Sequence, residues 1–278
     1  MRVICDKQRF GSATRRNAVI AMSNLIGTAV ALDDEMLTFL CVEVHNFVNS
    51  CFGGDWTPLM NMLWHLLLST TETYVRCKIL AQPDAETGDL ETDGVDSDGD
   101  TVEYNTLVCA LIEFISQLSG IKRCRTKLTP YLSNVCLQLA RLMQLPRSVI
   151  DRWLTNLGEF IEESDESLGY SVRLTTLDVL QRFALRFSNW NDAFHNTLSQ
   201  LFAHAEEQHS KGDPFWWTSL EVALYLCGSF PRSFTAKEKT SMSKDVAALG
   251  LDIISSRYVM PSLQQTGTSV FVFVISCA

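Results

Sequence analysis

Residues 104–119 read YNTLVCALIEFISQLS, and their spacing is the strongest indication of the fold class. Its apolar side chains recur every three or four positions, which is the spacing of one stripe along an amphipathic helix. The stripe consists of Tyr104, Leu107, Val108, Leu111, Ile115 and Leu118. We therefore expect a helix over 103–119 that packs one face against neighbouring helices.

The same spacing returns along most of the chain. Three further stripes are Leu132, Val135, Cys136, Leu139 and Met143; Phe194, Leu198, Leu201, Phe202 and Ala205; and Trp216, Leu220, Ala223, Leu224 and Cys227. Between residues 168 and 187 the apolar positions cover two sides, which is typical of a helix between two neighbours. Three pairs, Thr57-Pro58, Thr129-Pro130 and Asp213-Pro214, place a capping side chain before a proline, which favours a helix start.

The pattern predicts helices over 12–31, 34–51, 56–79, 103–119, 122–143, 147–162, 168–187, 190–209, 214–229 and 236–255. Their similar lengths and short connections predict an all-α fold in which antiparallel helix pairs stack as repeats. The β-branched and aromatic run at 270–275 resembles a strand instead, and it does not fit the helical pattern.

The composition limits the classes of partner and the cellular location that we expect for the chain. The chain has a formal net charge of −9 and 46% hydrophobic residues. An acidic surface repels nucleic acid phosphates and favours basic protein partners, so we expect no direct nucleic acid binding. The longest apolar runs are shorter than the ~18 residues that span a bilayer, and the first twenty residues lack a secretory signal, so we expect a soluble intracellular chain without membrane contact. The nine cysteines form no Cys-x-x-Cys pair, which favours buried reduced thiols.

One long segment, 82–103, breaks the helical pattern and predicts a disordered acidic insertion between two helices. It contains nine acids: Asp84, Glu86, Asp89, Glu91, Asp93, Asp96, Asp98, Asp100 and Glu103. A mobile polyanion of this kind either only solubilises the chain or captures Lys/Arg-rich proteins electrostatically. A third alternative is calcium, because residues 89–100 partly match an EF-hand loop, although Asp96 stands where an apolar residue is expected and the last position is not Glu.

A second acidic cluster precedes the helix that begins near residue 170. Glu162, Glu163, Asp165 and Glu166 are the candidate partner-binding residues of this cluster. The alternative is that they only place favourable charge at a helix N-terminus.

Nothing in the sequence predicts catalysis or a cofactor. We find no phosphate-binding glycine loop, no His-Glu-x-x-His and no nucleophile elbow, so we expect a protein that is not an enzyme. His65, within an apolar run, and the pair Trp216-Trp217 are expected to pack in the core, while His204 and His209 are expected to lie on different faces. The basic cluster Lys122, Arg123, Arg125 and Lys127 is expected to form a solvated turn between helices.

Several motifs together carry a resemblance. TETYVR at 71–76, DSDG at 96–99 and Leu107-Val108 are followed by WLTN at 153–156, Phe160 and YSVR at 170–173, and then by Trp216-Trp217, Glu221 and LCGS at 226–229. From about residue 44 to 260 this order resembles the central part of importin-9-like members of the karyopherin-β family. The resemblance implies a HEAT-repeat α-solenoid whose inner surface holds basic cargo such as histones or ribosomal proteins, and which shuttles between cytoplasm and nucleus.

The resemblance also implies further partners. The complete receptors bind the GTPase Ran through N-terminal repeats, and they meet nuclear pore proteins. Nothing before Val44 matches those repeats, and the TGTSVF tail at 266–271 departs from the pattern. We therefore expect residues 1–278 to be one solenoid fragment with an insertion at 82–103 and an atypical tail at 264–278, with Ran acting through the complete receptor. The alternative is a helical scaffold without a transport role.

Overall fold

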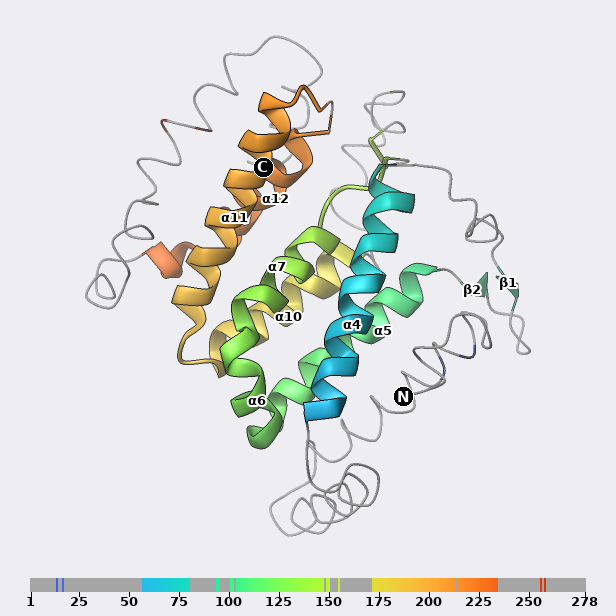
Figure 1. The fold of residues 1–278 in the computed structure, drawn as a ribbon, viewed down its shortest axis with the longest axis vertical. Coiled ribbons are helices and arrows are strands. Elements are labelled where there is room, and N and C mark those ends of the chain that lie inside the picture. Colours follow the sequence, from blue (N-terminus) through green and yellow to red (C-terminus); the bar gives the residue numbers. More distant parts are fainter. Residues whose placement is uncertain are drawn as a thin grey trace. The chain divides into compact units, whose positions relative to one another are not determined.

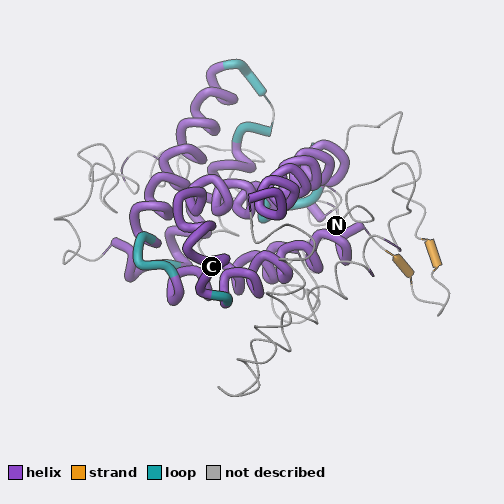
Figure 2. The backbone as a smooth tube through the Cα atoms, turned by 60° about the horizontal axis from the view of Figure 1, so that its bottom comes forward, coloured by secondary structure: helices purple, strands orange, loops and turns teal. Residues whose placement is uncertain are grey.

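The computed structural model describes residues 57–80, 94–95, 101–102, 104–147, 149–150, 172–213 and 215–234, with Thr14, Asn17, Thr155, Ser256 and Tyr258 as single positions. The helices are α4 (Thr57–Tyr74), α5 (Tyr104–Gly120), α6 (Lys122–Leu128), α7 (Leu132–Leu142), α10 (Val172–Arg186), α11 (Trp190–Ser210) and α12 (Trp217–Ser229), with the π-helix η1 (Val75–Ile79) and the 3-10 turns η2 (Thr129–Tyr131) and η3 (Pro231–Phe234). Helix accounts for nearly all of the described trace, which confirms the all-α prediction (Figures 1 and 2).

The predicted helix over 122–143 was wrong as one element. The structure divides it into α6 and α7 with η2 between them. Pro130 is the physical reason, because a proline has no amide hydrogen to donate to the preceding turn and its ring crowds that turn. The backbone N–H of Thr129 and its hydroxyl, the latter at 2.9 Å, both donate hydrogen bonds to the Arg125 carbonyl oxygen at the end of α6. The basic cluster of 122–127 thus lies on a short helix and not on a turn.

A small ladder lies within the acidic insertion. The strands β1 (Gly94–Val95) and β2 (Thr101–Val102) pair antiparallel, with Gly94 opposite Val102 and Val95 opposite Thr101. The helical pattern did not predict this ladder. It contains one Gly–Val pair and one Val–Thr pair, which are too few to form a sheet with a core. The rest of 82–103 lies outside the described residues.

The chain forms two compact units, each made of two separate stretches: residues 1–131 with 146–187, and residues 132–145 with 188–278. In the first unit α5 and α10 pack side by side. Arg186 near the end of α10 bonds Ser116 and Ser119 near the end of α5, while Thr175 near the start of α10 lies at Cys109 near the start of α5. The two helices therefore run parallel.

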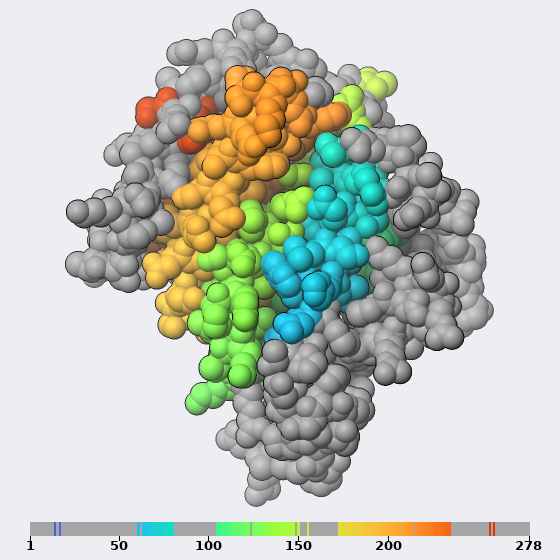
Figure 3. Space-filling model, viewed as in Figure 1, coloured from blue at the N-terminus to red at the C-terminus, as the bar shows by residue number. Residues whose placement is uncertain are grey.

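In the second unit α11 packs on both α7 and α12, and Figure 3 shows the side chains of α7 and α11 in contact. The hydroxyl of Thr197 on α11 lies 3.3 Å from the Ser133 carbonyl oxygen near the start of α7. Further along α11, His204 contacts the same Ser219 hydroxyl as Gln144, which follows the end of α7, so α7 and α11 are parallel. The ring of Trp190 at the start of α11 lies 5.1 Å from that of Phe230 just beyond α12. The helices α11 and α12 therefore form an antiparallel pair.

The two parallel pairs share a similar offset along the chain. Contacts between α5 and α10 join residues 67 and 70 positions apart, and the contact between α7 and α11 joins residues 64 positions apart. Like offsets for successive helices are what repeated helical hairpins produce. The offset exceeds the ~40–47 residues of a HEAT unit by about the length of the segment 151–171, which both pairs span.

The predicted stripes are buried. Every described member of the stripes on α5, α7 and α11 is less than a tenth exposed, and the same holds on α12 for Leu220, Ala223, Leu224 and Cys227. Three expectations were wrong in detail: His65 is exposed, and Trp216 and Trp217 are only half-buried. On α10 the second side is buried at Leu180 and Phe187, whereas Leu177 and Ala184 are half-buried.

In the part of the chain that the structure describes, no single helix has the length and apolar content to cross a membrane. One bent pair of helices, 104–120 with 124–142, reaches that length and composition jointly. The predicted helices over 34–51 and 236–255 and the strand-like run at 270–275 lie outside the described residues, apart from Thr14 and Asn17 none of 12–31 is described, and the single-solenoid organisation stays a prediction.

Candidate protein-binding surface

The predicted partner-binding acids all lie outside the described residues. This holds for the nine acids of 84–103 and for Glu162, Glu163, Asp165 and Glu166. What the structure does place is the pair of helix ends that flank the insertion. The π-helix η1 ends at Ile79, which is 1% exposed, and α5 begins at Tyr104, which is 7% exposed. The hydroxyl of Tyr104 donates a 3.4 Å hydrogen bond to the Thr70 carbonyl oxygen of α4.

The insertion is therefore attached to a packed part of the first unit at both ends. The calcium alternative at 89–100 lies outside the described residues, apart from Gly94 and Val95.

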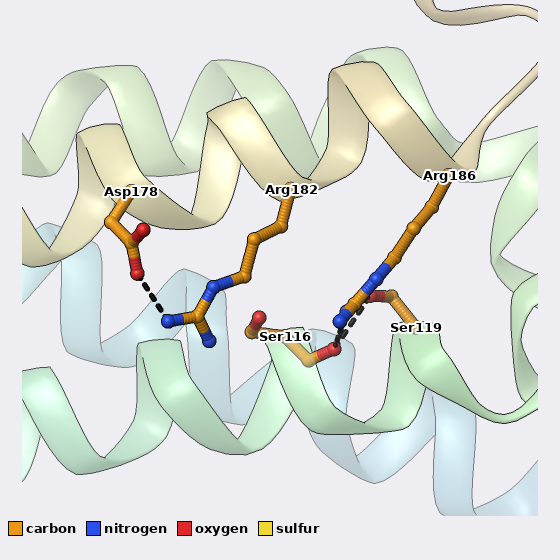
Figure 4. A network of polar contacts seen from close by, with 5 residues as sticks. All are labelled: Ser116, Ser119, Asp178, Arg182 and Arg186. Carbon is orange, nitrogen blue, oxygen red and sulfur yellow. Dashed lines mark hydrogen bonds and ion pairs between the residues drawn. The ribbon is translucent and has the colours of Figure 1, made fainter. Parts of the chain in front are cut away.

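A basic cluster occupies the opposite end of α5. Arg186 donates 2.8 Å hydrogen bonds to the Ser116 carbonyl oxygen and to the Ser119 hydroxyl, and Arg182 pairs with Asp178 at 2.5 Å (Figure 4). Burial lowers the pKa of Arg186, and repulsion from Arg182 and Arg125 lowers it further. A cation at the C-terminal end of α5 is stabilised by the helix dipole. The sequence pattern indicated the basic cluster of α6, but it gave no signal that this cluster lies near the arginines of α10.

In the second unit a polar cluster links three helices of that unit. The side-chain amide of Gln144 donates a 3.1 Å hydrogen bond to the Ser219 hydroxyl, and Nδ1 of His204 lies 3.1 Å from the same oxygen. Burial lowers the pKa of His204, with a further lowering by Arg141. His209 packs on Trp216 with ring centroids 4.4 Å apart. Both histidines thus contact the 216–219 segment, although five residues on α11 separate their directions by about 140°.

A second buried polar cluster is structural. Nε2 of His195 donates a 2.8 Å hydrogen bond to the Ser233 carbonyl oxygen, and the indole of Trp190 donates a 3.2 Å bond to the Ser233 hydroxyl. The rings of Phe194, Phe230 and Phe234 surround this pair of residues. The cluster fixes η3 against the start of α11.

The described thiols are reduced, as expected. Cys109, Cys124, Cys136 and Cys227 are buried, and Cys77 is half-buried. Burial raises the pKa of Cys124 and of Cys227 to about 12. Among the residues that the structure describes, no group of three His, Cys, Asp or Glu side chains is placed to hold a metal ion.

Comparison with known proteins shows a similarity to an importin. The chain is 21% identical over 208 residues to Importin-9 of Drosophila melanogaster, an alignment that covers 74% of this chain and 20% of the relative. The chain thus spans about a fifth of the length of that relative. No family model matches the chain. The alignment indicates a distant karyopherin-like relationship of an all-α protein.

Proposed function

We propose that this chain is part of a nuclear transport receptor of the importin-9 kind and that it binds basic protein cargo. The observation that carries the proposal is the similarity to Importin-9 over three-quarters of the chain. The helical packing supports it, because parallel helices at a similar offset occur in both units, as helical repeats require. The net charge of −9 favours a partner that carries positive charge.

The cargo-binding residues in this proposal are the acids of 84–103 and of 162–166. The nine acids of the insertion equal the formal excess charge of the chain. Attraction between a local polyanion and a Lys/Arg-rich protein raises the association rate, and it favours basic proteins over competitors that are not basic. Core histones and ribosomal proteins are cargo of this charge. The role is non-catalytic, and no cofactor takes part in it.

In this proposal, Ran and nuclear pore proteins bind the complete receptor, and that receptor shuttles between cytoplasm and nucleus. The fragment itself contributes cargo contacts in this account. A helical scaffold without a transport role would use apolar grooves, so its partner binding would respond little to salt.

The test is the affinity of the full chain for a fluorescently labelled core histone dimer, measured by anisotropy. One variant changes the nine acids of 84–103 to Asn or Gln, and a second does the same at Glu162, Glu163, Asp165 and Glu166. A control variant neutralises Glu113, Asp192 and Glu206, which are exposed acids on α5 and α11. We expect the nine-acid variant to lose about tenfold or more in affinity and the control to change less than about twofold.

Unchanged binding by the nine-acid variant would refute the role of the insertion. Absence of any histone binding by the wild-type chain would refute basic cargo as the partner. Ordering of 89–100 by micromolar calcium would favour the metal alternative instead.

A further inference from the structure

In the first unit, cationic side chains of α6 and α10 lie near the end of α5. Together they form a positively charged surface on a chain that is acidic overall. Lys122 and Arg125 lie three residues apart on α6 and so share one face of that helix. Arg182 and Arg186 lie on α10, and the charge of Arg186 interacts with those of both Arg125 and Arg182. We call Lys122, Arg125, Arg182 and Arg186 the basic patch.

Packing fixes the patch. The two hydrogen bonds from Arg186 to Ser116 and Ser119 hold its guanidinium against the end of α5, as Figure 4 shows. The turn after α5 brings α6 to the same end, because α6 begins two residues beyond Gly120 and packs on α5. Three guanidinium groups therefore stand near one helix end without needing a ligand to assemble them.

The patch has a surplus of positive charge. Asp178 pairs with Arg182, and no ion pair to Lys122 or Arg125 is present among the described residues. Like charges at this spacing repel one another, and an anion placed between them relieves the repulsion. Planar guanidinium groups bind carboxylates through two parallel hydrogen bonds, which makes a carboxylate the fitting ligand.

An exposed leucine borders the patch. Leu185 is 89% exposed, and it lies three residues after Arg182 on the same face of α10. Leu174, which is 42% exposed, lies on that face as well, four residues before Asp178. A large aliphatic side chain beside a group of cations fits a partner that carries both carboxylates and an apolar side chain.

We propose that the basic patch, with Leu185 at its edge, binds a short acidic peptide segment of a partner protein that carries leucine-like side chains among its carboxylates. A nucleic acid fits less well, because its long polyanion would also meet the acidic remainder of a chain with net charge −9. A short peptide interacts mainly with the charges of the patch, because screening at physiological salt limits the electrostatic field of more distant acidic residues to about 8 Å. The surface is opposite in sign to the proposed cargo site and does not depend on it.

The test uses the full chain and a fluorescein-labelled peptide, EDLEEDLEEDLE, in about 150 mM salt. The variant Lys122→Glu with Arg125→Glu reverses the α6 face of the patch. Lys127→Glu is the matched control, because Lys127 is exposed on the same helix but points away from Lys122 by about 140°. Leu185→Ser tests the apolar edge, and a twelve-nucleotide oligothymidylate tests the nucleic acid alternative.

We expect the double reversal to weaken peptide binding about tenfold or more, Leu185→Ser to weaken it about threefold, and Lys127→Glu to change it less than about twofold. Circular dichroism spectra that match the wild type establish that each variant is folded. The proposal is overturned if the wild type does not bind the peptide, if the double reversal binds like the wild type, if Lys127→Glu weakens binding equally, or if the oligothymidylate binds more tightly than the peptide. None of these results bears on histone binding by the acidic insertion.

Discussion

The guanidinium of Arg186 donates a 2.8 Å hydrogen bond to the backbone carbonyl oxygen of Ser116, seventy positions earlier in the chain. That carbonyl lies near the end of α5, where it also accepts a hydrogen bond from the Ser119 hydroxyl. Arg186 therefore stabilises the parallel packing of α5 and α10 by adding a second donor at the end of one helix, a cap contributed by a side chain of the other.

Removal of this contact should destabilise the first unit. We expect Arg186→Met to lower the free energy of unfolding by about 1.5 kcal/mol, because the charge-assisted hydrogen bonds to the Ser116 carbonyl oxygen and the Ser119 hydroxyl are lost. Arg182→Met is the control, since its exposed pair with Asp178 contributes about 0.3–0.5 kcal/mol. Urea denaturation followed by circular dichroism measures both. Equal losses in the two variants would contradict the capping role.

Two leucines on α10 offer a matched test of the core. Leu180 is 2% exposed and Leu185 is 89% exposed. We expect Leu180→Ala to cost about 2–5 kcal/mol through lost burial and the cavity that remains. Leu185→Ala should change stability by less than about 0.5 kcal/mol. If thermal or urea unfolding shows the larger loss at Leu185, the orientation of α10 is wrong.

The described cysteines should differ in reactivity. Burial raises the pKa of Cys109, Cys124, Cys136 and Cys227, so at pH 8 these thiols remain protonated and unreactive. Cys77 is half-buried and should be alkylated first among these five. Iodoacetamide labelling of the native chain, with peptide mapping by mass spectrometry, assigns each site. Uniform labelling of all five in the folded protein would be incompatible with the packing.

His204 should titrate below its ordinary value of about 6.5, because burial and Arg141 disfavour its charged form. The unfolded chain then binds the proton more readily than the folded one, so stability rises with pH through this window and is lost as pH falls below about 6.5. Proton NMR of the ring gives the midpoint, and the His204→Gln variant should lose less stability than wild type between pH 7.5 and 5.5. A midpoint at or above 6.5 would contradict the arrangement around Ser219.

The sequence was informative where one physical signal dominated. Helical spacing of apolar residues predicted which side chains of α5, α7 and α11 are buried, because burial of an apolar face outweighs local propensity. The turn at Asp213 was predicted only in part. Its carboxylate accepts a 2.8 Å hydrogen bond from the Phe215 amide. The helix α12 begins later than predicted, however, with Trp216 as its N-cap and no side-chain cap.

Other features depend on contacts that no local pattern encodes. The break at Pro130 was misjudged because the apolar spacing continues on both sides of it. His65 lies in an apolar run yet is exposed, since one face of α4 remains open at that position. The basic patch joins α6 to α10 across about sixty residues, and its assembly follows from the packing of both helices on α5. The predicted acidic site falls outside the described residues and stays a prediction.

We propose that the acidic insertion, not an apolar groove, receives a basic partner. Hydrogen-exchange mass spectrometry of the full chain, with and without a core histone dimer, distinguishes the two. We expect protection on binding to concentrate in 82–103, with a smaller effect at 159–166, and to disappear when salt is raised to about 0.5 M. Protection confined to the helices, or protection that survives high salt, would contradict it.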